Sequence, residues 1–170
     1  MKIRFTFDPH KCSACGACAI ACMDQNDIDI AGGQAPYRRV YQHESDTAHV
    51  YMSVACLHCA DAPCAAACPM ECLYKDGATG LTLYDTACCI GCRACGKACP
   101  YDAITFRPRE DDPRRVRMEK CRGCPERIAA GLEPACVQAC PTGAIAWHWA
   151  EEAEENPLQT LYALYPPADI

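Results

Sequence analysis

The residues with the clearest chemical potential are four cysteines in the run Cys89-Ile-Gly-Cys92-Arg-Ala-Cys95-Gly-Lys-Ala-Cys99-Pro100. Their spacing, C-x2-C-x2-C-x3-C-P, is typical of iron–sulfur cluster ligation. Three thiolates within seven residues can wrap one face of a cubane, and Gly91 allows the tight backbone turn between them. Cys99 comes about one helical turn after Cys95. Pro100 disfavours helical backbone at Cys99, so we expect a short helix to end there.

The same chemistry recurs in three further groups. These are Cys12, Cys15, Cys18 and Cys22; Cys56, Cys59, Cys64 and Cys68; and Cys121, Cys124, Cys136 and Cys140. The first group has Met23 where proline would follow, the second has a middle gap of four residues, and the last is split by an insertion of 11 residues. In two-cluster ferredoxins the fourth cysteine of such a run reaches the other cluster. We therefore expect the groups to work in pairs.

Composition narrows the class of protein. The chain has 170 residues, 18 cysteines and a formal net charge of -6, which indicates a metal protein or a disulfide scaffold and argues against a general nucleic-acid binder. No run of about 18 apolar residues is present, so we expect no membrane span. The start of the chain, residues 1–8, resembles neither a secretory signal nor a twin-arginine signal. We expect a cytoplasmic protein, with export beside a signal-bearing partner left open.

The pattern predicts an α+β fold of short strands, short helices and many loops. Residues 1–11 alternate as a half-buried strand does. Hairpins are expected at 37–41 with 50–54 and at 73–74 with 81–84. The second hairpin would turn at Asp76-Gly77. Aromatic residues make up only 8% of the chain, so bound cofactors are expected to organise much of the interior.

The later segments are predicted in the same way. Residues 103–106 should form a strand, residues 107–115 an exposed charged connector, and residues 126–130 a helical turn. Trp147 and Trp149 alternate in a further strand. In the tail, Glu151, Glu152, Glu154 and Glu155 are expected to start a short helix that ends before Pro166-Pro167 and has the apolar face Leu161, Tyr162, Leu164 and Tyr165.

Three segments repeat without gaps. They are Cys68-Pro69-Met-Glu-Cys72-Leu73, Cys99-Pro100-Tyr-Asp-Ala103-Ile104 and Cys140-Pro141-Thr-Gly-Ala144-Ile145. Each is expected to be the exit of a cluster-binding helix that turns into a short strand. Internal duplication of this kind indicates stacked ferredoxin-type modules.

Some residues of interest have more ordinary interpretations. Cys72 and Cys88 lie outside the four groups of four, and we interpret both as small buried apolar residues. His58, inside a cysteine loop, could tune a cluster, but an ordinary loop residue is the preferred interpretation. Lys120 could mark an electron exit beside Cys121, but a solvated lysine is preferred.

Two other uses of cysteine fit the spacing less well. Structural zinc sites also use C-x2-C pairs, but they usually join two separated pairs, unlike the three closely spaced cysteines here. A disulfide framework is disfavoured because cysteines this tightly spaced could not all pair without strain.

The run from Cys12 to Cys140, including Tyr37-Arg38-Arg39-Val40-Tyr41, resembles the four-cluster iron–sulfur subunits of the dimethyl sulfoxide reductase family of molybdopterin and tungstopterin oxidoreductases. The match covers about three quarters of the chain. It implies that the first group pairs with the fourth and the second with the third. It implies four 4Fe-4S clusters on these ligand sets: Cys12, Cys15, Cys18 and Cys140; Cys121, Cys124, Cys136 and Cys22; Cys56, Cys59, Cys64 and Cys99; and Cys89, Cys92, Cys95 and Cys68.

The sequence thus predicts an electron-transfer protein in two ferredoxin-like dicluster lobes. The inner lobe would span 51–107, the outer lobe would combine 1–50 with 108–150, and 151–170 would be a docking tail. No catalytic acid, base or nucleophile is evident, so catalysis is expected in a larger molybdenum or tungsten partner subunit. The short tail and the lack of an extra membrane anchor differ from larger family members. A hydrogenase or formate-oxidising partner, a flavin or membrane-anchor redox subunit, self-association and a purely structural module remain alternatives.

Overall fold

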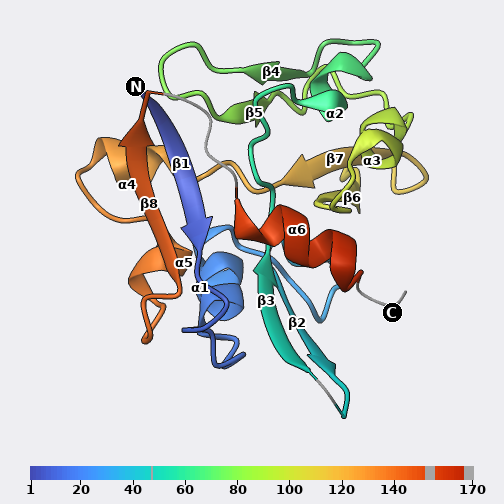
Figure 1. The fold of residues 1–170 in the computed structure, drawn as a ribbon. Coiled ribbons are helices and arrows are strands. Elements are labelled where there is room, and N and C mark those ends of the chain that lie inside the picture. Colours follow the sequence, from blue (N-terminus) through green and yellow to red (C-terminus); the bar gives the residue numbers. More distant parts are fainter. Residues whose placement is uncertain (47, 152–155, 167–170) are drawn as a thin grey trace.

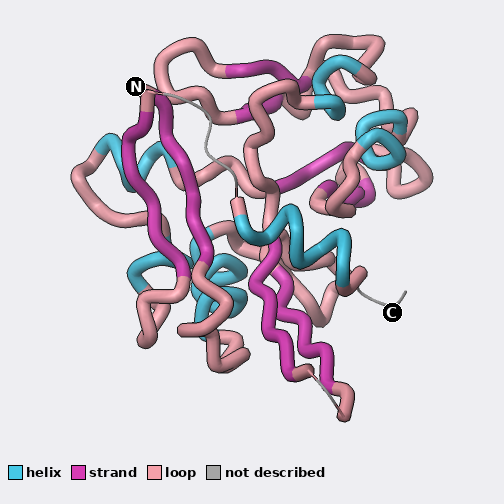
Figure 2. The backbone as a smooth tube through the Cα atoms, in the orientation of Figure 1, coloured by secondary structure: helices cyan, strands magenta, loops and turns pink. Residues whose placement is uncertain are grey.

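The chain forms eight short strands and six short helices within residues 1–46, 48–151 and 156–166, the parts that the computed structural model describes (Figures 1 and 2). In chain order these elements are β1 (Lys2–Phe7), α1 (Ala17–Gln25), β2 (Arg39–Glu44), β3 (His49–Val54), α2 (Pro63–Ala66), β4 (Leu73–Lys75), β5 (Thr82–Tyr84), α3 (Ala94–Ala98), β6 (Ile104–Pro108), β7 (Val116–Lys120), α4 (Pro125–Ala129), α5 (Ala135–Gln138), β8 (Ile145–Ala150) and α6 (Pro157–Leu164). The predicted α+β class is confirmed.

The strands form four separate antiparallel pairs. β2 pairs with β3, β4 with β5, and β6 with β7, each as a hairpin of consecutive strands. The fourth pair joins the first strand of the chain to the last, because Lys2 of β1 lies opposite Ala150 of β8 and Phe7 lies opposite Ile145. β1 and β8 run side by side in Figure 1.

The predicted repeat is confirmed as a structural unit. α2, α3 and α5 each lead through a Cys-Pro pair into β4, β6 and β8. As expected, α3 ends before Cys99, whose backbone is extended at φ -82 and ψ 115. In all three units the third residue after the cysteine is left-handed, with φ 51 at Glu71, 45 at Asp102 and 65 at Gly143.

The described residues form two apolar cores, and cysteines belong to both. The first contains Phe7, Met52, Val54, Ile145 and Leu158, together with Cys18 and Cys136. The second contains Leu73, Ile104 and Met118, together with Cys64 and Cys95. The thiols are thus part of the packed interior, so the fold and the candidate site depend on each other.

One predicted connector is wrong in part. Residues 107–115 were expected to be exposed, but Arg107 and Pro108 belong to β6, and the chain then returns as β7. The backbone N–H of Arg109 donates to Arg115 O at 2.9 Å and closes the turn. Strand β7 alternates buried Met118 and Lys120 with partly buried neighbours, and the lysine at a buried position masked its strand pattern.

The predicted tail helix starts later than expected. Glu151 is not helical, and Glu152, Glu154, Glu155 and Pro167 lie outside the described residues. Asn156 begins the helix by accepting the Leu158 N–H at 3.0 Å, and its side-chain amide donates to Phe5 O at 3.0 Å. Buried Leu158 fastens α6 onto the first core, while Leu164 is 65% exposed. No helix in the described part of the chain is both long and apolar enough to cross a membrane.

Candidate functional site

Left-handed residues shape every cysteine loop. The second residue after the first cysteine of each group has positive φ: Ala14, His58, Gly91 and Gly123. At Gly91 there is also no room for a larger residue, because a Cβ there would lie 2.4 Å from Val116 O. The loops therefore curl each run of cysteines inward.

The structure gathers the cysteines around four cavities, with four thiols of one implied ligand set lining each. We name these set A (Cys12, Cys15, Cys18, Cys140), set B (Cys22, Cys121, Cys124, Cys136), set C (Cys56, Cys59, Cys64, Cys99) and set D (Cys68, Cys89, Cys92, Cys95). The cavities of sets A, D and C have empty volumes of about 300, 310 and 340 Å³. Their similar size suits a group of one kind, while the cavity of set B opens into a wider space of about 790 Å³.

Backbone N–H groups point at the sulfur atoms. Five such donors lie 3.3–3.5 Å from a thiol: His58 to Cys56, Cys72 to Cys68, Ala103 to Cys99, Met118 to Cys89 and Gly123 to Cys121. Donors of this kind stabilise thiolate sulfur and help set the reduction potential of an iron–sulfur cluster.

The arrangement fits a multi-iron cluster better than a single ion. In the described residues, no three His, Cys, Asp or Glu side chains converge closely enough to hold one metal ion. A cubane instead takes one thiolate at each of four separate irons, so its ligands surround a space. The thiols of sets A to D surround cavities in this way, which disfavours the zinc alternative.

Thiol acidity differs among the sets. Burial raises the pKa of Cys22 to about 12 and the pKa values of Cys59 and Cys95 to about 11. Burial also acts to raise the pKa of Cys68 and of Cys140, but hydrogen bonds to these sulfurs outweigh it and lower both values. Cluster binding needs deprotonated thiols. Deprotonation therefore costs more free energy at Cys22, Cys59 and Cys95 than at Cys68 and Cys140.

Arg38 supplies positive charge between sets A and B. Its side chain is 6% exposed and donates to the backbone oxygen and hydroxyl of Ser53, each at 3.0 Å. Burial acts to lower the pKa of Arg38, but thiols of both sets raise it above its usual value. Its buried Nε has no partner among the described residues, and this N–H lies on a side chain that lines the set B cavity. Sulfur of a bound cluster is a suitable acceptor.

The interpretation of Lys120 as a solvated lysine is wrong, because the residue is fully buried. Its side chain is 0% exposed, lines the set C cavity and donates to Thr82 O and to Cys121 O. Its Nζ also lies 5.7 Å from the centre of the Tyr84 ring. Because Cys121 belongs to set B, this ammonium group sits where sets B and C meet.

His58 is also more than an ordinary loop residue. It is 3% exposed, its ring stacks on Phe5 at 6.0 Å, and its Nδ1 accepts the Thr82 N–H at 3.0 Å. Burial lowers its pKa well below the usual value, and the positive charges of Lys120 and Lys75 add to this effect. The imidazole is therefore neutral, with its proton on Nε2, which has no partner among the described residues. In the sequence, the only sign that His58 has a special role is its position between Cys56 and Cys59.

Short helices connect neighbouring sets. Cys18 of set A and Cys22 of set B share α1, where four residues correspond to about 6 Å along the axis. α5 packs on α1 and leads from Cys136 of set B to Cys140 of set A. In the same way, packed helices α2 and α3 connect sets C and D. Sets B and C meet at Cys121, whose pKa is raised by burial and then by Cys22 and Cys56.

The two outer sets reach the surface. Among the 18 cysteines, all of which are described, the exposed ones are Cys15 of set A and Cys92 of set D. The cysteines of sets B and C are buried or partly buried.

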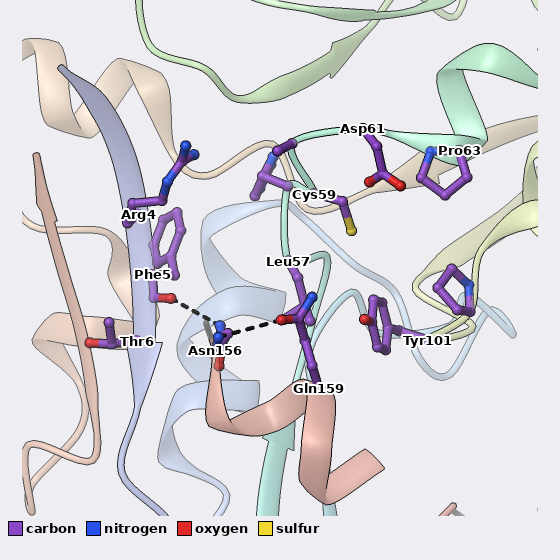
Figure 3. Close-up of a pocket in the computed structure, with 13 residues that line it drawn as sticks. Arg4, Phe5, Thr6, Leu57, Cys59, Asp61, Pro63, Tyr101, Asn156 and Gln159 are labelled. Atoms are coloured by element: carbon purple, nitrogen blue, oxygen red, sulfur yellow. Dashed lines mark hydrogen bonds between the residues drawn. The ribbon is translucent and has the colours of Figure 1, made fainter. Parts of the chain in front are cut away.

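A further cavity lies beside set C, at the start of α6. Figure 3 shows it between β1, the loop that carries Cys59, Tyr101 and the start of α6, with an empty volume of about 1100 Å³. Its polar groups Asn156 and Gln159 cap α6, and Asn156 ties the helix to Phe5. The cavity thus marks where α6 is fastened beside set C.

Comparisons with known proteins agree with this picture. A family model described as a 4Fe-4S dicluster domain matches residues 47–148. The chain is 35% identical to the B subunit of anaerobic dimethyl sulfoxide reductase of Haemophilus influenzae, over 98% of this chain and 83% of that protein. It is 36% identical to the thiosulfate reductase electron transfer subunit of Salmonella typhi, over 86% and 76%. It is 31% identical to the arsenate respiratory reductase iron-sulfur subunit of a Shewanella species, over 85% and 80%.

Proposed function

Because this chain belongs to the 4Fe-4S dicluster iron–sulfur subunits of the dimethyl sulfoxide reductase family of molybdopterin oxidoreductases, we propose that sets A to D each bind one 4Fe-4S cluster. The chain is an electron-transfer subunit, and catalysis belongs to another subunit of the complex. The observation that supports four clusters is that each of four separate cavities is lined by the four thiols of one set.

The clusters are arranged in series as A, B, C and D. Helices α1 and α5 link sets A and B, α2 and α3 link sets C and D, and Cys121 with Lys120 lies at the middle junction. Each 4Fe-4S cluster supplies one-electron chemistry when bound. The residues of this chain hold the thiolates, donate N–H groups to sulfur and place Arg38 and Lys120 between neighbouring sets.

The two exposed ends suit two partners. We propose that a catalytic molybdopterin or tungstopterin subunit lies at one end and a flavin-containing or membrane-anchored redox subunit at the other. Cys15 and Cys92 mark these ends. Thiolates exposed in this way are kept reduced most readily in the cytoplasm, which is the location we propose, with export beside a signal-bearing partner as the alternative.

Metal analysis and spectroscopy test the proposal. Anaerobically prepared protein should contain about sixteen irons and an equal amount of sulfide, four for each cubane. Stepwise reduction followed by electron paramagnetic resonance should show four reducible, interacting centres. Zinc in place of iron, or only two clusters per chain, would contradict it. Copurification followed by molybdenum, tungsten and nickel analysis identifies the class of catalytic partner.

A further inference from the structure

A fifth cysteine lines the cavity of set D. Besides the four thiols of that set, the wall includes Cys72, which is 2% exposed. The sister cavities have alanine at the matching point of the repeat: Ala103 lines the cavity of set C, and Ala144 lines that of set A.

The backbone holds this position in the same way in two of the units. The Cys72 N–H donates to the Cys68 sulfur at 3.3 Å, and the Ala103 N–H donates to the Cys99 sulfur at 3.4 Å. The residue before each is left-handed. The repeated turn therefore places the side chain of the fourth residue after the cysteine in the cavity wall. At this position sets A and C have the methyl group of an alanine, and set D has the thiol of Cys72.

Cys88 lies close by but does not line the cavity. Its thiol donates to Asp85 O at 3.3 Å, and the Asp85 N–H donates to Cys72 O at 2.9 Å. Cys88 is thus a neighbour of Cys72 that offers an internal control.

Set D is also one of the exposed ends. Cys92 is exposed, and the cavity rim carries Met70 and Ile90, which are 46% and 50% exposed. An iron–thiolate bond at such an end is more open to attack by solvent and oxidants than one in set C, whose cysteines are buried or partly buried.

We propose that Cys72 is a reserve ligand of set D, able to replace Cys68 when the iron–thiolate bond of Cys68 is lost. This inference rests on the proposed function. In the exchange, the bond between iron and the Cys68 sulfur breaks and a bond between that iron and the Cys72 sulfur forms. The proton of the Cys72 thiol passes to the released Cys68 thiolate, and no electron is gained or lost.

Ligand variants of the full chain, loaded anaerobically with iron and sulfide, test the exchange. Cys68→Ala should keep the wild-type iron content of about sixteen per chain and the full spin count after reduction. Cys68→Ala with Cys72→Ala should lose one cluster, about a quarter of the iron. Cys68→Ala with Cys88→Ala should keep all four.

Set C provides the matched comparison. Cys99→Ala should lose one cluster because Ala103 offers no replacement thiol, and adding Ala103→Cys should restore it. If Cys68→Ala is insoluble, Cys68→Val with and without Cys72→Ala gives the same comparison, because valine also offers iron no ligand atom.

The outcomes separate the two proposals. If the wild-type chain holds four clusters but Cys68→Ala loses as much iron as the double variant with Cys72→Ala, the reserve role is overturned and the proposed function stands. If the wild-type chain holds no clusters, the proposed function itself fails.

Discussion

Lys120 places a positive charge in the interior with no ion pair to a carboxylate in the described part of the chain. An isolated buried ammonium group is costly. The Nζ of Lys120 donates to the backbone oxygen of Cys121 of set B, and its side chain lines the cavity of set C. The sulfurs of these two sets would carry negative charge with clusters bound. A fixed positive charge favours the more negative, reduced state of such a cluster, so Lys120 should raise the reduction potential at this junction.

Replacing Lys120 by methionine should lower that potential. We expect Lys120→Met to lower the midpoint potential of one inner cluster by at least about 59 mV. For a one-electron couple, this corresponds to a tenfold change in the equilibrium constant of reduction. A redox titration followed by electron paramagnetic resonance measures it, with iron content checked first.

Lys11 gives the matched control because it precedes Cys12 as Lys120 precedes Cys121. The Lys11 side chain is 59% exposed, so solvent and salt screen its charge. Lys11→Met should leave all midpoints nearly unchanged. Equal shifts in the two variants would argue against a role for burial.

Thiol protonation gives a prediction about pH. Burial raises the pKa of Cys22 to about 12 and those of Cys59 and Cys95 to about 11, above the ordinary 9.0. Raised pKa values stabilise the cluster-free fold below about pH 9, and this contribution is lost as the pH rises toward 11–12. Cluster binding needs thiolates and has the opposite dependence. In competition with an iron chelator, retention should therefore be greater at about pH 9 than at about pH 7, and equal retention would contradict this.

At the scale of elements, the cysteine spacing predicted more than the hydrophobic pattern did. The Cys-Pro exits, the hairpins and the strand at β1 were expected because turn residues and alternation mark them. β7 and the start of α6 were not, because a buried lysine looks polar in sequence and four glutamates resemble a helix start. The burial of His58 and Lys120 depends on contacts with Phe5, Thr82 and Tyr84, which are distant in the chain and leave no local signal.

The contact between the Cys89 loop and β7 can be tested at Gly91. Gly91→Ala would place a Cβ 2.4 Å from the backbone oxygen of Val116, so the loop must move and set D should lose its cluster, about four irons. Gly131 has the same φ of +74 with nothing within 4 Å. Gly131→Ala should keep all clusters, at a cost of about 1 kcal/mol. Iron analysis and thermal unfolding measure the difference, and equal iron loss in both variants would contradict the steric argument.

At the scale of the whole molecule, the four sets differ in access to solvent. Cys15 and Cys92 are exposed at the two ends, whereas the inner sets have buried or partly buried cysteines. Limited oxidation should therefore remove iron from sets A and D first, to a plateau near half of the initial content.

Alkylation of the freed thiols identifies which sets were lost. At the plateau, mass spectrometry should find label on Cys15 and Cys92 and little on Cys121 or Cys64. Uniform labelling of all four sets would show that the ends do not control access.

The pairing of β1 with β8 has a consequence for synthesis. All cysteines of sets C and D lie between Cys56 and Cys99, whereas sets A and B need Cys136 and Cys140 from near the end of the chain. A nascent polypeptide can therefore complete sets C and D while its last third is still being translated. Sets A and B must wait until the ribosome releases β8, so the molecule should acquire the iron of sets C and D before that of sets A and B.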